Sequence, residues 1–295
     1  MLPTHHTRSG AATSSSSSSS LLLKLTYTEY AARMVRFRQM DFEYALWLML
    51  NLIISPRTAF RSTLYHSRTK HQWARDDPAF VVVLLYLLLV ASVSWSFAFA
   101  WRTPLQVLGL FAYVACVDFL LLGVALSTIG WWFANAYLHE QAQSQLGALQ
   151  ASSSHVGGSA YARLASRAAS GASWAIAHGA AAAERRSGES VEWLYAFDVH
   201  CNAFLPIYLL LYLAQYLLLP VLLRPGLFAR FLANGLYALA FSSYHYLTFL
   251  GYSEMPFLTK CEVFVYPIAL VLLAFALSLP LGVNCSALVV YIYFG

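Results

Sequence analysis

The chain has 295 residues, of which 59% are hydrophobic and 11% are charged, far below the ~25% charged residues of a typical soluble domain. This composition excludes an ordinary soluble domain and predicts an all-α, polytopic helical membrane protein, because the apolar runs are continuous rather than alternating as in a β-barrel. The formal net charge is +5, and the four cysteines form no Cys-x-x-Cys pair, which disfavours a structural zinc site.

The chain before the first long apolar run divides into two predicted regions. Residues 1–28 are polar and serine-rich, and we expect a disordered tail because they bury too little apolar surface. Residues 29–79 predict a basic cytosolic and interfacial region. Within it, Met40–Ile54 is too short to span and predicts a helix that lies in the membrane interface or against the bundle. We expect the basic side chains of residues 57–75 to face anionic lipid head groups, or else to form a solvated face or a partner site.

Phe80–Trp101 is the strongest feature of the sequence, because its 22 residues carry no charge. As a helix they would reach roughly 33 Å, enough for a hydrocarbon core of about 30 Å. Asp76 and Asp77, followed by Pro78, suit the start of this helix.

A second apolar run begins only two residues later and continues from Pro104 to Phe133, so residues 80–137 predict a transmembrane hairpin. Residues 138–190 are rich in alanine, serine and glycine and predict a low-complexity cytosolic loop. Residues 191–295 predict three further spans and a short lumenal tail at the far interface. The three spans are expected near Ala203–Leu223, Leu227–Leu250 and Val263–Leu281.

The distribution of the basic residues predicts the orientation of the five spans in the membrane. Fifteen of the 18 Lys and Arg residues lie on the side of the N-terminus, against three on the other side, which are Arg102, Arg224 and Arg230. The positive-inside rule therefore predicts a cytosolic N-terminus and a lumenal C-terminus.

Asp118 lies midway along the second predicted span. A carboxylate at that depth costs at least about 2.5 kcal/mol on insertion scales unless it is neutral, paired or hydrated. It is either a functional residue or a protonated acid that is hydrogen-bonded to a neighbouring helix. No other span carries an aspartate at similar depth, which argues against a protease dyad.

Asp198, His200 and Asn202 recur at every second position near a predicted membrane edge. On a helix, neighbours in this series point about 200° apart, whereas an extended entry would place all three on one side. They form a structural cap with a hydrogen-bonded histidine, a contact for a partner or lipid head group, or a metal site completed by His245 or Glu254. No phosphate-binding loop or catalytic motif is present, so we predict no cofactor, resident metal or catalytic residue.

Four blocks, in the same order, resemble the Unc-fifty family of Golgi membrane proteins: residues 37–43, 72–80, 195–204 and 248–258. The resemblance covers residues 33–137 and 191–283. With Asp118, it marks the candidate partner-contact or structural residues Arg38, Asp41, Trp73, Arg75, Asp76, Asp77, Asp198, His200 and Asn202.

The resemblance implies a five-span protein of the Golgi membrane and the early secretory pathway, including the endoplasmic reticulum, with no enzymatic activity. It also implies a role in vesicle-mediated transport, in which relatives are linked to guanine-nucleotide exchange factors of ARF GTPases and to delivery of receptors to the cell surface. RNA is a further partner ascribed to the family, and no RNA-binding signature in this sequence supports it.

Three functional interpretations follow. In the first, a cytosolic face made of residues 29–79 and the loop edges recruits a soluble trafficking factor to the bilayer. In the second, the chain is a transporter or membrane-embedded enzyme in which Asp118, Asp198 and His200 converge on a polar cavity. In the third, the helical bundle stabilises other membrane proteins without a pocket.

Overall fold

The computed structural model describes residues 40–62, 72–75, 77–99, 103–138 and 190–294, and these form helices and no strands. The predicted tail, residues 1–28, most of the loop 138–190, and the candidates Arg38 and Asp76 lie outside the described residues.

Four helices in the described part of the chain are long and apolar enough to cross a membrane. The first is α4 (Ala79–Ala98), and the last joins η5 (Cys261–Val265) to α12 (Pro267–Ser278). The second, Pro104–Leu138, consists of α5 (Pro104–Tyr113), η2 (Val114–Leu121), α6 (Leu122–Phe133) and η3 (Ala134–Leu138). The third, Trp193–Leu222, consists of α9 (Trp193–Ile207), η4 (Tyr208–Ala214) and α10 (Gln215–Leu222).

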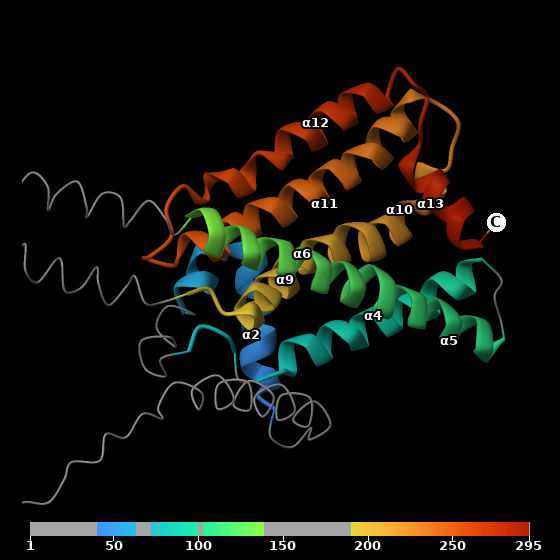
Figure 1. Cartoon of the computed structure of the whole chain (residues 1–295). Helices are drawn as coiled ribbons and strands as arrows, with labels where there is room; N and C mark the ends of the chain where they lie inside the picture. The colour runs from blue at the N-terminus through green and yellow to red at the C-terminus, as the bar shows by residue number, and fades with distance from the viewer. Residues whose placement is uncertain (1–39, 63–71, 76, 100–102, 139–189, 295) are drawn as a thin grey trace, which may run out of the picture.

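The fifth long helix, α11 (Leu227–Ser253), is less apolar than these four because tyrosine, serine and histidine interrupt it. It follows α10 after a short turn, packs along α9 and α12, and returns the chain to the end where α12 starts (Figure 1). A helix of 27 residues reaches about 40 Å, which is enough for a crossing. The chain is therefore a polytopic helical membrane protein, as the sequence predicts.

The helix that contains the third span starts at Trp193, ten residues before the span expected near Ala203–Leu223. Asp198 and His200, which the sequence places near a membrane edge, are each only 3% exposed. Arg75, in the segment before α4, pairs with Asp198, and Tyr244 of α11 contacts His200 Nδ1. The helix continues through Pro206 into the π-helical stretch η4.

The second and third spans pack closely because small residues line the face of α6 that meets α9 and α11. Gly123, Ser127 and Gly130 lie at helical spacing and are all buried. A Cβ atom at Gly123 would lie 2.5 Å from His200 Nε2, and one at Gly130 would lie 2.7 Å from Tyr252 Oη. Small residues allow this approach where larger side chains would hold membrane helices apart.

The predicted short helix is present as α2 (Phe42–Ile54), and it packs against α4 and α9. One face of α2 is buried in the bundle through Ala45, Leu48, Met49 and Leu52. Its other face also exposes apolar side chains, among them Leu46, Leu50 and Ile54. Apolar character on both faces is typical of a helix with a further apolar environment around it.

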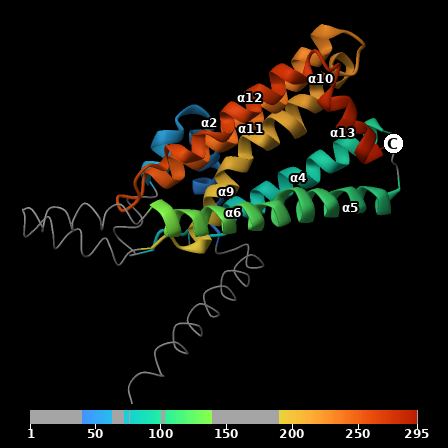
Figure 2. The ribbon, with the colours of Figure 1, turned by 45° about the horizontal axis from the view of Figure 1, so that its top comes forward.

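The last helix, α13 (Cys285–Phe294), lies between the ends of two layers, one formed by α4 with α5 and the other by α10 to α12 (Figure 2). Asn234 of α11 fixes the turn before it, because its amide donates to Val283 O at 2.9 Å and its oxygen accepts from Cys285 N at 2.9 Å. The tail that the sequence analysis expected at the far interface is therefore a helix that packs against the bundle.

Candidate functional site

Three of the four sequence blocks meet at the end of the bundle where α4 and α9 begin. We call the polar group at their meeting point the Arg75 cluster, which consists of Trp73, Ala74, Arg75, Glu192, Asp198 and Asn202. Its members come from the segment that leads into the first span and from the start of the third span, more than 110 residues apart in sequence.

Two carboxylates hold the segment that leads into α4 by its backbone. Glu192 accepts from Trp73 N at 3.2 Å through Oε1 and from Ala74 N at 3.1 Å through Oε2. Asp198 Oδ2 accepts from Arg75 N at 2.7 Å. Three consecutive backbone N–H groups therefore have charged acceptors, which give shorter and stronger hydrogen bonds than neutral ones.

The Arg75 side chain completes the cluster. Its Nη2 lies 3.4 Å from Asp198 Oδ1, 3.4 Å from Asp198 O and 2.9 Å from Asn202 Oδ1, and its guanidinium carbon lies 4.6 Å from the centroid of the Phe80 ring. Asp198 and Asn202 lie four residues apart and share one face of α9. The prediction that Arg75 faces lipid head groups is wrong, because its side chain turns into the bundle and is 15% exposed.

Aromatic side chains connect the cluster to the fourth block. Trp73 makes edge contacts with Tyr195 and Phe257, at centroid distances of 6.0 and 5.9 Å. Tyr195 donates to Gly251 O at 2.7 Å, and a Cβ atom at Gly251 would lie 2.7 Å from Val199 Cγ2. The blocks at 72–80, 195–204 and 248–258 thus form one packed unit.

The first block joins this unit through two aspartates. Asp77 accepts from Ala79 N at 3.0 Å through Oδ1, at the start of α4, as the sequence predicts for an acid before a helix. Its Oδ2 accepts from Asp41 N at 2.7 Å. Asp41 caps α2 by accepting from Tyr44 N at 2.9 Å. One carboxylate therefore ties the start of α2 to the start of α4.

His200 points away from Asp198, as helical geometry requires. Its Nδ1 lies 2.9 Å from Tyr244 Oη, and Phe119 and Phe204 pack around the ring at centroid distances of 5.7 and 5.9 Å. No three His, Cys, Asp or Glu side chains within the described ranges are grouped so as to hold a metal ion. The geometry agrees with the interpretation of His200 as a hydrogen-bonded histidine of the bundle.

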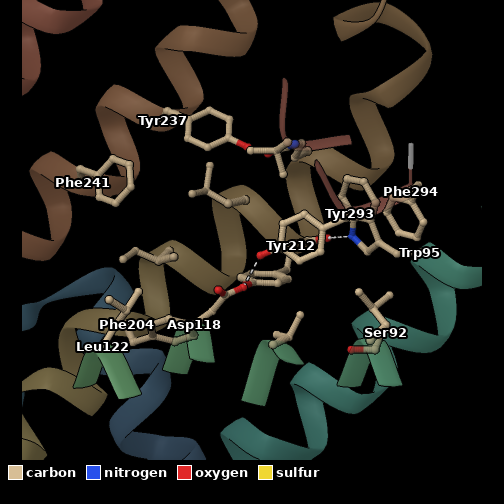
Figure 3. A pocket seen from close by; sticks show the side chains of 16 residues that line it. Ser92, Trp95, Asp118, Leu122, Phe204, Tyr212, Tyr237, Phe241, Tyr293 and Phe294 are labelled. Atoms are coloured by element: carbon tan, nitrogen blue, oxygen red, sulfur yellow. Dashed lines mark hydrogen bonds between the residues drawn. The ribbon is translucent and has the colours of Figure 1, made fainter. Parts of the chain in front are cut away.

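Asp118 lies in a third place, in η2 of the second span. Its Oδ2 accepts from Tyr212 Oη at 2.9 Å and from Tyr293 Oη, so the carboxylate joins the second span to η4 and α13 (Figure 3). Asp118 lines a cavity of about 240 Å³, whereas neither Asp198 nor His200 does. The convergence that the transporter or enzyme interpretation requires is therefore not found.

Several partners could not be found from sequence. Glu192 stands directly before the third block, and that position is the only signal for it. Tyr212 and Tyr293 carry no motif, and they are two among 19 tyrosines in the chain. Their meeting with Asp118 depends on how η4 and α13 fold back, which no local pattern encodes.

Comparison with known proteins places residues 30–294 within the UNC-50 family. The chain is 36% identical to the protein unc-50 homolog of Dictyostelium discoideum over 289 residues, which cover 98% of this chain and 94% of that protein. It is 34% identical to the human protein unc-50 homolog over 87% of this chain and 82% of that protein. It is 33% identical to protein unc-50 of Caenorhabditis elegans over 88% and 71%, respectively. No solved structure matches the chain.

Proposed function

The chain belongs to the UNC-50 family, and from this premise we propose that it is a non-enzymatic membrane protein of the Golgi and the early secretory pathway. In this proposal it acts in vesicle-mediated transport. It recruits a guanine-nucleotide exchange factor of ARF GTPases to the membrane and supports the delivery of receptors to the cell surface.

The observation that carries the proposal is the convergence of all four sequence blocks on one end of the bundle. The charged groups at their centre are turned inward onto backbone N–H groups and onto each other. Such groups shape the end of the bundle, because their hydrogen-bonding capacity is directed at the protein itself. A fixed and defined end of this kind suits a docking surface for a protein partner.

The outer side of the same end carries charged side chains that are free to meet a soluble factor. Exposed members are Glu43, Arg57, Arg61, Lys260 and Glu262. Arg57 and Arg61 flank Phe60, which is 1% exposed and packs beside Gly251 of α11. The distribution of Lys and Arg along the sequence supports a cytosolic position for this end.

Affinity purification of the full-length protein from membranes, followed by identification of partners, tests the proposal. We expect the wild type to recover an ARF exchange factor, and the double variant Arg57→Glu with Arg61→Glu to lose it while keeping its thermal stability. Arg224→Glu, an exposed arginine at the other end of the bundle, is the matched control and should recover as much as the wild type.

The proposal fails if the wild type recovers no exchange factor, or if the double variant and Arg224→Glu behave alike. Recovery of RNA in place of an exchange factor, lost in the same double variant, would replace the protein partner with a nucleic acid. Imaging of the tagged full-length chain checks the location, since a protein absent from Golgi and endoplasmic reticulum membranes contradicts it.

A further inference from the structure

An apolar cavity of about 240 Å³ lies between α4, the second and third spans, α11 and α13 (Figure 3). Most of its 16 lining residues are aliphatic or aromatic, among them Trp95, Leu211, Phe241 and Val289. An apolar cavity of about 150 Å³ in another protein is enough to bind benzene. This cavity therefore has room for a larger apolar group, such as part of a ring system or of an acyl chain.

Two hydrogen-bond acceptors face this apolar space. Gln215 lines the cavity and is 1% exposed, and its Oε1 has no hydrogen-bond partner within the described residues. The second acceptor is the carboxylate of Asp118, which the phenols of Tyr212 and Tyr293 hold in place. The Gln215 amide also makes a side-chain hydrogen bond with Tyr237 of the same lining, which leaves Oε1 without a donor within the described residues. Buried acceptors are nearly always satisfied in proteins, so Gln215 Oε1 is an acceptor that a ligand in the cavity can use.

The backbone around the cavity is irregular on both sides. Asp118 lies in the π-helical stretch η2, and Tyr212 lies in the π-helical stretch η4. Pro206, shortly before η4, lacks the N–H group that a regular α-helix needs at that position. Trp95 Nε1 donates to Tyr212 O at 3.0 Å, which uses a backbone carbonyl of η4. Such π-helical stretches are rare and often occur at functional sites.

The lining selects among the polar groups of membrane lipids. It contains no lysine, arginine or histidine, so a phosphate head group would find no counter-charge. An ammonium group would meet a single carboxylate that already accepts two phenol hydrogen bonds. A hydroxyl group brings no charge into the cavity and carries the donor that Gln215 Oε1 lacks.

We propose that this cavity binds a neutral membrane lipid whose polar end is a hydroxyl group. The hydroxyl donates to Gln215 Oε1, and the adjoining apolar part of the lipid lies against the aromatic and aliphatic walls. A sterol and a diacylglycerol share this chemistry. The inference is independent of the proposed trafficking role.

The wall formed by α13 completes the site. Val289, Tyr293 and Phe294 of this helix line the cavity, and Phe294 stacks on Phe99 of the first hairpin with ring centroids 4.3 Å apart. Helix α13 thus contributes one wall of the proposed lipid site.

Photo-crosslinking of the full-length protein in lipid nanodiscs tests the proposal. The probes are a diazirine-bearing cholesterol, a diazirine-bearing diacylglycerol and, for comparison, a diazirine-bearing phosphatidylcholine. We expect saturable labelling by at least one hydroxyl probe, on peptides of the helices that line the cavity and with competition by the unlabelled lipid. The phosphatidylcholine probe should label without saturation.

Two variants locate the site. Leu211→Trp fills the cavity and should abolish saturable labelling, whereas Leu270→Trp on α12, where Leu270 is 68% exposed, should leave it unchanged. Gln215→Leu removes the acceptor and should weaken probe affinity about fivefold, the value of one hydrogen bond of ordinary strength. If gel filtration shows that Leu211→Trp does not fold, Gln215→Leu decides the question.

Each outcome has a meaning. Labelling by the cholesterol probe alone assigns a sterol, labelling by the diacylglycerol probe alone assigns a glycerolipid, and labelling by both supports the shared hydroxyl chemistry. The proposal is overturned if neither hydroxyl probe labels saturably, or if phosphatidylcholine saturates the same peptides. It is also overturned if a folded Leu211→Trp, or Gln215→Leu, binds like the wild type.

Discussion

Two aspartates inside the helical bundle, Asp198 and Asp118, meet opposite kinds of surroundings. Asp198 accepts from the backbone and the guanidinium of Arg75, in a cluster in which Asp198 and Asn202 are both buried. Asp118 accepts from two phenols and borders a cavity that also contains the partnerless acceptor of Gln215. The hydrogen-bond partners of Asp198 belong to the protein and hold its helices together. The acceptors that line the cavity beside Asp118 can still accept a hydrogen bond from a ligand.

The largest expected effect on stability comes from removing the guanidinium of Arg75 from the Arg75 cluster. Arg75→Met leaves the Asp198 carboxylate buried without its guanidinium partner, and we expect the free energy of unfolding to fall by about 3–5 kcal/mol. Reversible unfolding in mixed micelles measures it. Arg224→Met at an exposed position should change the same quantity by less than about 0.5 kcal/mol.

If Arg75→Met unfolds like Arg224→Met, the ion pair contributes nothing, and the contrast between the two aspartates disappears. Combining Arg75→Met with Asp198→Asn sharpens the result. The amide removes the unpaired charge, so the double variant should recover part of the stability that the single variant loses.

The next effect concerns how tightly the same end is packed. In Gly251→Ala the new Cβ atom would lie 2.7 and 2.9 Å from the two methyl carbons of Val199 and 3.2 Å from Phe60, so we expect a loss of about 1–3 kcal/mol. Gly109→Ala is the control, because no atom lies within 4 Å of its Cβ position.

At Gly109 alanine should stabilise the helix by about 0.5–1 kcal/mol, since it lowers the backbone entropy that folding removes. Val199→Ala in the Gly251→Ala background makes room for the added carbon and should restore part of the loss. Equal stability of the two glycine variants in the unfolding assay would contradict close packing at Gly251.

A smaller effect is expected at Asp118. Tyr293→Phe removes one of two phenol hydrogen bonds and keeps the ring, so unfolding should become easier by about 0.5–1.5 kcal/mol. Tyr291→Phe on the same helix is the matched control, because Tyr291 is 72% exposed. A loss as large as that of Arg75→Met would show that the two aspartates are equivalent after all.

The smallest effect on stability separates the two regions most clearly. Gln215→Leu removes a buried oxygen that has no partner and also the hydrogen bond of the amide with Tyr237. The two effects oppose each other, so the free energy of unfolding should stay within about 0.5 kcal/mol of the wild type. The same unfolding assay should show Asn202→Leu, in the Arg75 cluster, to be clearly destabilising. The comparison fails if both substitutions cost the same.

The sequence predicted the spans well because charge-free runs such as Phe80–Trp101 have one stable use in a bilayer. It did not predict that the helix of the third span already starts at Trp193, because the polar residues Asp198 and His200 lower the hydropathy of its first turns and their partners cannot be read from the sequence. Arg75 was assigned to lipid for the same reason. Hydropathy depends on local composition, and it carries no information about hydrogen bonds and ion pairs between segments that are distant in sequence.

The Asp118 site shows the same limit. The sequence predicts that Asp118 lies midway along the second span and that it can be hydrogen-bonded to a neighbouring helix. The cavity beside Asp118 could not be predicted from the sequence, because Tyr212 and Gln215 lie in the third span and Tyr293 lies in α13. Those positions meet only after a proline and two π-helical stretches have changed the helical register.

The hydrogen bonds from Trp73 N and Ala74 N to Glu192 have a consequence for the synthesis and membrane insertion of the protein. The two ends of this contact are separated by 118 and 119 residues, so the anchor leaves the ribosome about 6–24 seconds after the segment it secures, at 5–20 residues per second. During that interval the segment that leads into the first hairpin lacks its contacts with Glu192. An insertase or chaperone can bind this segment before those contacts form.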